Sequence, residues 1–257
     1  GRRGLNCLSP EIAALAERSR ALNPRGIEQN RLQRNMLSSQ LMCFNLFGPL
    51  DVEGELATTL VQSLAGEPVA EVTAVAFEYA PQPRGQYLND ATAFDVFVEY
   101  RGEDGKLRFL GIEVKLSEPF SPTRYVLEER PAYQRWLDSP SAPWAPEVRG
   151  LLDAKAHNQL WRDHMLAFAL SERGSERYAS GKLLLIRHPA DKKTAIAVDG
   201  YAALLTSTDT TFIDMPLDQL MTRWMPLAAG TGQEPWLNEF QRRYVDLAGS
   251  DALWSVM

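Results

Sequence analysis

Hydrophobic and polar residues alternate along two neighbouring stretches in the middle of the chain, residues 94–100 and 107–116. The intervening segment, residues 102–105, reads Gly-Glu-Asp-Gly and has the composition of a turn. The pattern therefore predicts a β-hairpin. Because side chains alternate between the two faces of a strand, Asp95, Glu113 and Lys115 share one face. The opposite face is apolar and consists of Val96, Val98, Tyr100, Leu110, Ile112, Val114 and Leu116.

The length of the hairpin loop decides whether the two acids meet. Opposed residues in an antiparallel pair share a face, so a four-residue loop would set Asp95 against Ile112 and separate the acids. A three-residue loop over residues 103–105 sets Asp95 directly opposite Glu113. That loop length favours a type I turn followed by a left-handed residue, a position that suits Gly105. We therefore expect the three-residue loop, or a bulge of the same parity.

Two opposed carboxylates need compensation. Opposed Cβ atoms lie about 4.5–5.5 Å apart, and like charges there are destabilising. Lys115 can offset one negative charge, and a divalent cation with oxygen ligands would offset the other. The alternative is an ordinary ladder of surface charges on a half-solvated hairpin. The apolar neighbours Phe94, Phe97, Phe109 and Ile112 favour the buried site over the ladder.

The rest of the chain predicts helices on both sides of a sheet. Strand 69–79 is expected to place Val72, Ala74, Ala76 and Glu78 on one face. The order of helices, strands and hairpin predicts an α/β fold with a mixed sheet around a central antiparallel hairpin. Helices are expected over residues 10–22, about 27–47, 52–65, 147–172, 217–224 and 234–248, and further strands over residues 182–187, 194–198 and 212–215.

Composition and motif content limit the class of protein and the cellular compartment to be expected. A chain of 257 residues with 45% hydrophobic and 23% charged residues suits one elaborated domain. No apolar run approaches about 18 residues, and no signal-peptide pattern opens the chain, so we expect no membrane contact. Cys7 and Cys43 lie far apart and form no metal-binding spacing, which favours a reducing cytoplasm. The chain has no P-loop, G-x-S-x-G or HExxH motif, and His157, His164 and His188 lack a zinc-ligand spacing.

Charge is unevenly distributed. The net charge of −6 argues against indiscriminate DNA binding, but residues 1–35 carry seven arginines against three acids. Arginines outnumber lysines 21 to 6, which favours bidentate phosphate contacts, although an arginine-rich genome explains the ratio equally well. The expected division is a basic N-terminal helical arm (1–35), a core (36–190) and a C-terminal extension (191–257) within a single domain.

Asp95, followed on the next strand by Glu113-Val114-Lys115, resembles the signature of the PD-(D/E)XK nuclease superfamily, with Phe94 where the motif has proline. More narrowly, the chain resembles a group of uncharacterised proteins classed as restriction endonucleases. The resemblance covers roughly residues 30–190 and rests on segments 38–47, 94–100, 111–118 and 158–164.

The resemblance implies a restriction-endonuclease-like core and a Mg²⁺ ion, replaceable by Mn²⁺, held by Asp95, Glu113 and the Val114 carbonyl. Lys115 would orient the attacking water and stabilise the transition state. Glu78 is either a third carboxylate of that site or a solvated strand-end residue.

Several further polar residues have two interpretations. Gln159, Arg162 and Glu118 either grip phosphate or orient ligands, or they are structural. Gln40 either lines the catalytic face or bonds to neighbouring backbone.

The expected function is a Mg²⁺-dependent nuclease that hydrolyses phosphodiester bonds, with DNA favoured over RNA as the substrate. A homodimer is compatible with this expectation. One alternative keeps the fold as a non-catalytic module that binds nucleic acid or a partner protein. Another makes the chain a structural accessory of a defence or repair complex. In that case the basic arm and the aromatic segment 123–150 would contact partners.

Overall fold

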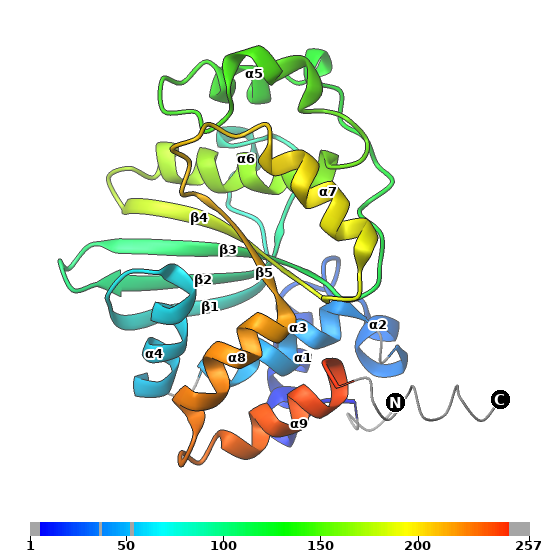
Figure 1. The fold of residues 1–257 in the computed structure, drawn as a ribbon, viewed down its shortest axis with the longest axis vertical. Helices are drawn as coiled ribbons and strands as arrows, with labels where there is room; N and C mark the ends of the chain where they lie inside the picture. The colour runs from blue at the N-terminus through cyan, green and yellow to red at the C-terminus, as the bar shows by residue number, and fades with distance from the viewer. Residues whose placement is uncertain (1–5, 36–37, 52–53, 247–257) are drawn as a thin grey trace.

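The structure of the 257-residue chain is a computed structural model, which describes residues 6–35, 38–51 and 54–246. These residues form one five-stranded mixed sheet with strands in chain order (Figure 1). The first three strands are antiparallel neighbours, and the last two run parallel to the third. The predicted α/β fold with a central hairpin is confirmed. The strands are β1 (Val69–Tyr79), β2 (Phe94–Gly102), β3 (Leu107–Lys115), β4 (Tyr178–Arg187) and β5 (Phe212–Pro216).

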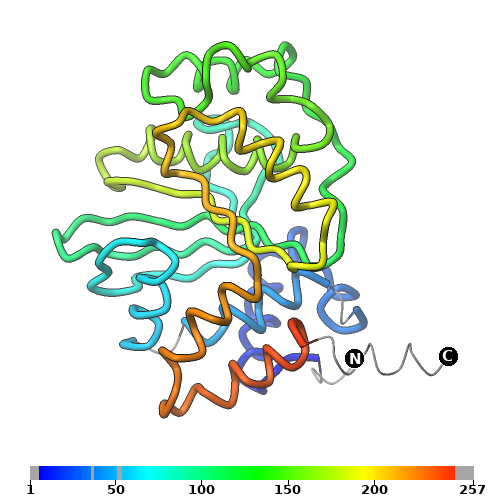
Figure 2. The backbone as a smooth tube through the Cα atoms, viewed as in Figure 1, coloured from blue at the N-terminus to red at the C-terminus, as the bar shows by residue number. Residues whose placement is uncertain are grey.

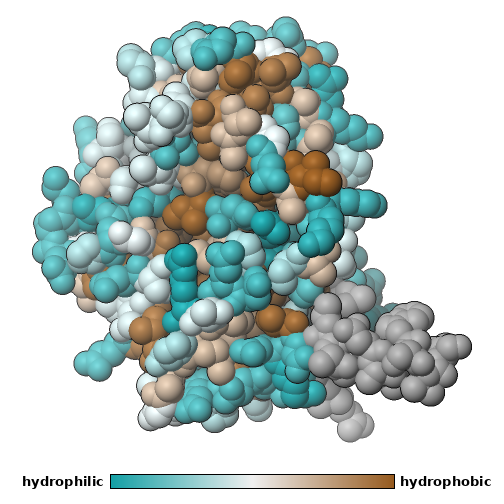
Figure 3. All heavy atoms as spheres, in the orientation of Figure 1, coloured by the Kyte–Doolittle hydropathy of each residue, from teal (hydrophilic) through white to brown (hydrophobic). Residues whose placement is uncertain are grey.

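Helices cover both faces of the sheet and bury a separate apolar cluster on each (Figures 1 and 2). On the viewed face, outward side chains are mainly hydrophilic (Figure 3). One face carries α1 (Pro10–Leu22), α3 (Ser39–Phe47), α4 (Gly54–Ala65), α8 (Leu217–Ala228) and α9 (Glu234–Tyr244), and the other carries α5 (Pro131–Leu137), α6 (Asn158–Arg173) and α7 (Lys192–Ala202). The remaining helical segments are α2 (Gln29–Arg34), η1 (Gly48–Asp51), η2 (Arg84–Gln86), η3 (Leu127–Glu129) and η4 (Pro146–Leu151).

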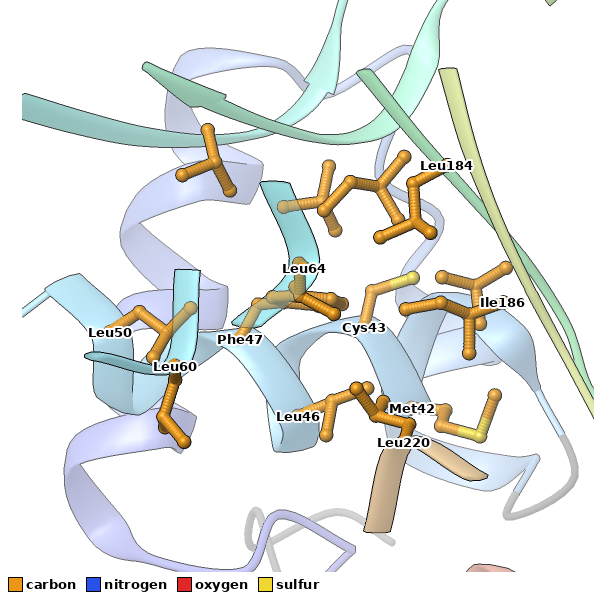
Figure 4. Packing of buried hydrophobic residues seen from close by; sticks show 14 of the residues in the cluster. Met42, Cys43, Leu46, Phe47, Leu50, Leu60, Leu64, Leu184, Ile186 and Leu220 are labelled. Carbon is orange, nitrogen blue, oxygen red and sulfur yellow. The ribbon is translucent and has the colours of Figure 1, made fainter. Parts of the chain in front are cut away.

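Helix α3 lies at the centre of the first cluster. Every residue of this helix is buried, including Gln40 and Asn45. Figure 4 shows Cys43 beside Ile186 of β4, and Leu46 and Met42 beside Leu220 of α8. Helix α3 thus supports the strands that carry the candidate site.

The β2–β3 hairpin has the predicted parity. Val96 lies opposite Ile112 and Val98 opposite Leu110. The loop consists of residues 103–105, closed by a 3.0 Å hydrogen bond from the Gly102 N–H to the Lys106 carbonyl. Gly105 adopts φ +78°, the left-handed conformation expected of it. The three-residue loop is therefore confirmed.

Strand β1 differs from strict alternation. Its pairing with β2 shifts between Val72 and Ala74, as in a β-bulge. Val72 therefore packs against the first cluster, whereas Ala76 packs against the second. The expectation that both share one face with Ala74 and Glu78 is wrong, because the shift reverses the parity of the later residues.

Two helix boundaries and one strand were also predicted incorrectly. The helix expected over residues 27–47 is interrupted: α2 ends at Arg34 and α3 begins at Ser39, where the Glu118 carboxylate accepts the Ser39 N–H at 2.7 Å. The helix expected from residue 147 begins at Asn158 instead. The segment expected as strand 194–198 is α7, because the Asp191 side chain caps its first turn through the Thr194 N–H at 3.0 Å.

In the described part of the chain, no helix is long and apolar enough to span a membrane.

Candidate active site

The ends of β2 and β3 farthest from the hairpin turn meet the first turn of α6 (Figure 1). Asp95 is the second residue of β2, Glu113 and Lys115 end β3, and Gln159 is the second residue of α6. The segment that follows β3 passes over the same point, because the Ser121 N–H donates to Gln159 Oε1 at 2.7 Å.

The backbone ladder between β2 and β3 ends just before the acidic residues. The last regular pair is Val96 with Ile112, and one further step of that register sets Asp95 opposite Glu113. The Val114 N–H donates to Asp95 Oδ2 at 2.8 Å. The Asp95 side chain thus takes the place of a backbone partner at the point where the two strands separate.

Glu113 and Lys115 form a buried ion pair. The Lys115 ammonium lies 2.9 Å from Glu113 Oε1, and the exposed fractions of the two residues are 7% and 3%. Burial at this level excludes the alternative of a solvated surface ladder. Removing one residue of this pair would strongly destabilise the folded protein, because the other charge would stay buried without a partner.

Gln159 joins the two members of this pair. Its Nε2 donates to Glu113 Oε1 at 2.6 Å, and its Oε1 accepts from Lys115 Nζ at 3.2 Å. Since a side-chain amide is both donor and acceptor, Gln159 bonds the anion and the cation simultaneously. The amide of Gln159 therefore orients the ion pair, and its proposed role in substrate binding stays a prediction.

The local electrostatics are those of excess negative charge. Burial, followed by the charges of Glu113 and Glu78, raises the pKa of Asp95 well above its ordinary value. Burial lowers the pKa of Lys115, but the Glu113 and Asp95 carboxylates outweigh it, so the net pKa is raised. Lys115 therefore stays cationic, and its single charge does not neutralise the acids around it.

Glu78 lies close enough to influence these groups. Burial, opposed by a hydrogen bond from Gln40 and reinforced by Glu113, raises the pKa of Glu78 to about 7. The Gln40 Nε2–Glu78 Oε1 distance is 2.5 Å, and Glu78 itself has φ +51°. A third carboxylate thus borders the site, and whether it binds a ligand stays a prediction.

Gln40 bonds to backbone as well as to Glu78. It accepts from the Glu28 N–H at 3.0 Å and donates to the Gly26 carbonyl at 2.9 Å. The expectation of neighbouring backbone partners is therefore confirmed. These bonds engage both ends of the amide and hold it beside Glu78, and its proposed role in substrate binding stays a prediction.

Glu118 and Arg162 are also held by the protein. Glu118 accepts from the Ser39 and Ser117 N–H groups at 2.7 and 3.2 Å, which ties the segment after β3 to α3. Arg162 is 7% exposed, and its guanidinium lies 4.5 Å from the centre of the Tyr125 ring. Both therefore have structural contacts, and their proposed roles in substrate binding stay predictions.

Asp163 is a buried acid that the sequence reasoning missed. It lies one helical turn after Gln159 on α6, is 2% exposed, and its Oδ2 has no hydrogen-bond partner among the described residues. Burial, then the charge of Glu113, raises its pKa well above the ordinary value. The Gln159/Asp163 spacing of four on one helix was the available signal.

The side chains that could bind a metal are few. Among residues 6–35, 38–51 and 54–246, no group of three or more His, Cys, Asp or Glu side chains is arranged to hold a metal ion. Asp95 and Glu113 provide carboxylate oxygens, and hydrogen bonds to Glu113 within this part of the chain fall on Oε1 alone. A cation here would complete its coordination with backbone, water or substrate oxygens, the manner typical of Mg²⁺.

Comparison with known proteins agrees with the geometry. No curated protein and no solved structure matches the chain. The sequence model of the PD-(D/E)XK nuclease superfamily matches residues 1–246, a span that includes all five strands and the Asp95, Glu113 and Lys115 positions. The chain therefore belongs to the PD-(D/E)XK nuclease superfamily.

Proposed function

We propose that this protein hydrolyses phosphodiester bonds in DNA with the help of Mg²⁺, and that Asp95, Glu113 and Lys115 are its catalytic residues. Membership of a nuclease family implies a nucleic-acid substrate. The observation that carries the proposal is the buried Glu113–Lys115 pair, 2.9 Å apart, beside an Asp95 carboxyl of raised pKa. Perturbed ionisable groups of opposite charge gathered at one point are typical of catalytic sites.

The donor set fits Mg²⁺. Asp95 and Glu113 would hold the ion with the Val114 carbonyl, and carboxylate and carbonyl oxygens are the ligands that hard divalent cations prefer. Burial, and then the charges of Glu113 and Glu78, raise the pKa of Asp95, and a bound cation would offset the repulsion between these carboxylates. The chemistry supplied by a bound Mg²⁺ would be polarisation of the scissile phosphate and a lowered pKa of a coordinated water.

The chain's own residues would then orient the reactants and stabilise charge. The Lys115 ammonium would align the attacking water and stabilise negative charge that develops on the phosphate. Gln159 would hold Glu113 and Lys115 in register, since one amide bonds both. The Val114 N–H would keep the Asp95 carboxylate directed at the same point.

A cleavage screen tests the proposal. Full-length protein is incubated with single-stranded, duplex, branched and methylated DNA and with RNA, in Mg²⁺, Mn²⁺ or EDTA. We expect cleavage of DNA with either metal and none in EDTA. Glu113→Gln should lower the rate by about 10²-fold or more, since a proposed ligand of the ion and the partner of Lys115 is lost.

The matched control is Glu103→Gln, an exposed acid in the turn at the opposite end of the same hairpin, which should cleave like the wild type. Circular dichroism establishes that both variants are folded. Absence of cleavage over the whole panel, together with calorimetry that detects no Mn²⁺ binding, would favour the non-catalytic module instead.

A further inference from the structure

A cavity of about 810 Å³ lies next to the candidate active site. Its walls come from the segment after β3, the residues that precede α6, and α7. Figures 1 and 2 show that segment running past α7 on its way to α5. The volume is within the range of about 300–1,000 Å³ typical of small-molecule sites.

One wall residue connects the cavity to the proposed catalytic lysine. The Phe120 ring lines the cavity, and its centre lies 5.2 Å from Lys115 Nζ. Phe120 occurs five residues after Lys115, and Ser121 beside it donates its N–H to Gln159. The cavity therefore begins directly beside the proposed catalytic lysine.

The cavity combines apolar walls with positive charge at its edge. Ile196 is a wall residue and is 72% exposed, so its side chain offers apolar surface to a ligand in the cavity. Apolar side chains gather over the region of α7 in Figure 3. Lys155 and Lys193 are exposed wall residues, and neither forms a salt bridge with another described residue.

The one acidic wall residue is already engaged. Asp191 accepts the Thr194 N–H at 3.0 Å and the Thr194 hydroxyl at 2.7 Å, as the N-cap of α7. Its negative charge also lies at the positive end of the helix dipole. The lining therefore carries two lysine charges against one carboxylate, a net positive charge.

From these observations we infer that the cavity binds an unpaired nucleotide of the substrate next to the scissile phosphate. The base would stack on Phe120 and contact Ile196, while Lys155 and Lys193 would bind flanking phosphates. Sites for single-stranded nucleic acid combine aromatic stacking surfaces with positive charge in this way. The inference rests on the proposed function for its substrate class, and it adds a requirement for a single-stranded or locally melted segment.

Binding without turnover tests the inference. Full-length protein in EDTA is titrated into a fluorescent oligothymidylate of about 12 nucleotides, and anisotropy is measured at several salt concentrations. Lys155→Ala/Lys193→Ala should weaken binding about tenfold and reduce the slope of log K against log salt by about 1.4, since each lost single-strand phosphate contact contributes about 0.7. Phe120→Leu keeps an apolar wall but removes the stacking face, and should weaken binding about fivefold or more.

Lys192→Ala is the matched control, because Lys192 is an exposed α7 residue that does not line the cavity. We expect it to bind like the wild type. Equal affinity of the cavity variants and the wild type would overturn the inference. So would an equal loss in Lys192→Ala, or equally strong competition by a duplex of the same length.

The outcomes separate this inference from the proposed function. If the wild type cleaves nothing in Mg²⁺ but the cavity variants still bind the oligonucleotide more weakly, the cavity site holds and the proposed catalysis fails. If cleavage depends on Glu113 while the cavity variants bind normally, the proposed function holds and the cavity site fails.

Discussion

Asp95 and Glu99 are acidic residues on the same strand, β2, but their surroundings shift their pKa values in opposite directions. Glu99 is 7% exposed and accepts hydrogen bonds from Thr73 at 2.9 Å, Tyr178 at 2.8 Å and Arg177 at 2.5 Å. Burial raises its pKa, but these bonds outweigh burial and the net pKa is lowered. The only bond to the Asp95 carboxylate from a described residue is donated by the Val114 N–H, and its pKa is raised.

The difference shows which kind of buried acid marks a site. Both residues lose solvation, so burial alone does not distinguish them. Glu99 accepts three bonds from protein donors, one of them from a cationic guanidinium, so its charge is compensated within the protein. Asp95 shares its surroundings with Glu113 and Glu78, and the resulting excess of negative charge is one that a cation would relieve.

The largest expected effect is the loss of cleavage when the Asp95 carboxylate is replaced by a neutral amide. Asp95→Asn keeps the shape of the side chain but removes a proposed metal ligand, so we expect cleavage to fall by about 10²-fold or more. Without metal its melting temperature should equal or exceed that of the wild type, because the raised pKa means that the folded state disfavours the Asp95 charge. Unchanged cleavage by a folded Asp95→Asn protein would remove Asp95 from the site.

The next effect is the dependence of the free energy of unfolding on pH in the absence of divalent cations. Glu78 has a pKa near 7 in the folded protein and 4.5 as an ordinary value, so the folded state binds a proton more tightly than the unfolded state. The resulting stabilisation is present below about pH 4.5 and is lost as pH rises through 7. Denaturant titrations of wild type and Glu78→Gln in EDTA should therefore diverge between pH 5 and 8, by on the order of 2–3 kcal/mol.

Mg²⁺ sharpens this experiment. If the ion binds beside Glu78, it should reduce the loss of wild-type stability above pH 7, since a nearby cation favours ionised carboxylates. Parallel pH profiles of the wild type and Glu78→Gln in EDTA would show that Glu78 titrates normally.

Removing the Glu99 carboxylate should lower the stability of the protein and leave catalysis intact. Glu99→Ala removes the acceptor shared by Thr73, Arg177 and Tyr178, and we expect the free energy of unfolding to fall by about 2 kcal/mol. Cleavage per folded molecule should be unchanged. Glu71→Ala is the control, because Glu71 forms an exposed ion pair with Arg101 that is worth only a few tenths of a kcal/mol. Loss of cleavage in a folded Glu99→Ala protein would contradict the contrast between the two acids.

The smallest effect is expected at the hairpin turn. Gly105 has φ +78° with no atom within 4 Å of an added Cβ, so Gly105→Ala brings conformational strain and no clash. We expect a cost of about 1 kcal/mol in thermal or chemical unfolding, less for Gly105→Asn, and normal cleavage. If Gly105→Ala lowered cleavage as strongly as Asp95→Asn, the turn would be coupled to the site.

Local sequence patterns predicted much of the fold that supports the site. Strand β1 over Val69–Tyr79, helix α1 over Pro10–Leu22 and strand β5 from Phe212 agree with the predicted elements. The hairpin register was predicted because alternation and a glycine at the left-handed position restrict it to one parity. These features depend on neighbours in the chain, which is why a single sequence could reveal them.

Specific side-chain contacts, most of them between residues far apart in the chain, explain the errors. Alternating residues 194–198 resemble a strand, but the Asp191 cap and packing of Val198 and Tyr201 against the second cluster make a helix. The break between α2 and α3 coincides with the bond from Ser39 to Glu118, a residue 79 positions away. Gln159 bonds to Glu113, which lies 46 positions earlier in the chain, and no local hydrophobic pattern predicts such a contact.

The sequence alone determined the arrangement of the hairpin: that β2 and β3 pair, at what parity, and that Asp95, Glu113 and Lys115 share one face. The tertiary structure alone decided how these side chains are held. It buried the ion pair, set Gln159 between its two charges, brought Glu78 and Asp163 close to it, and left Asp95 with few donors. The physical reason is that strand parity follows from backbone geometry repeated at every residue, whereas burial and electrostatic coupling depend on elements that approach only when the chain has folded.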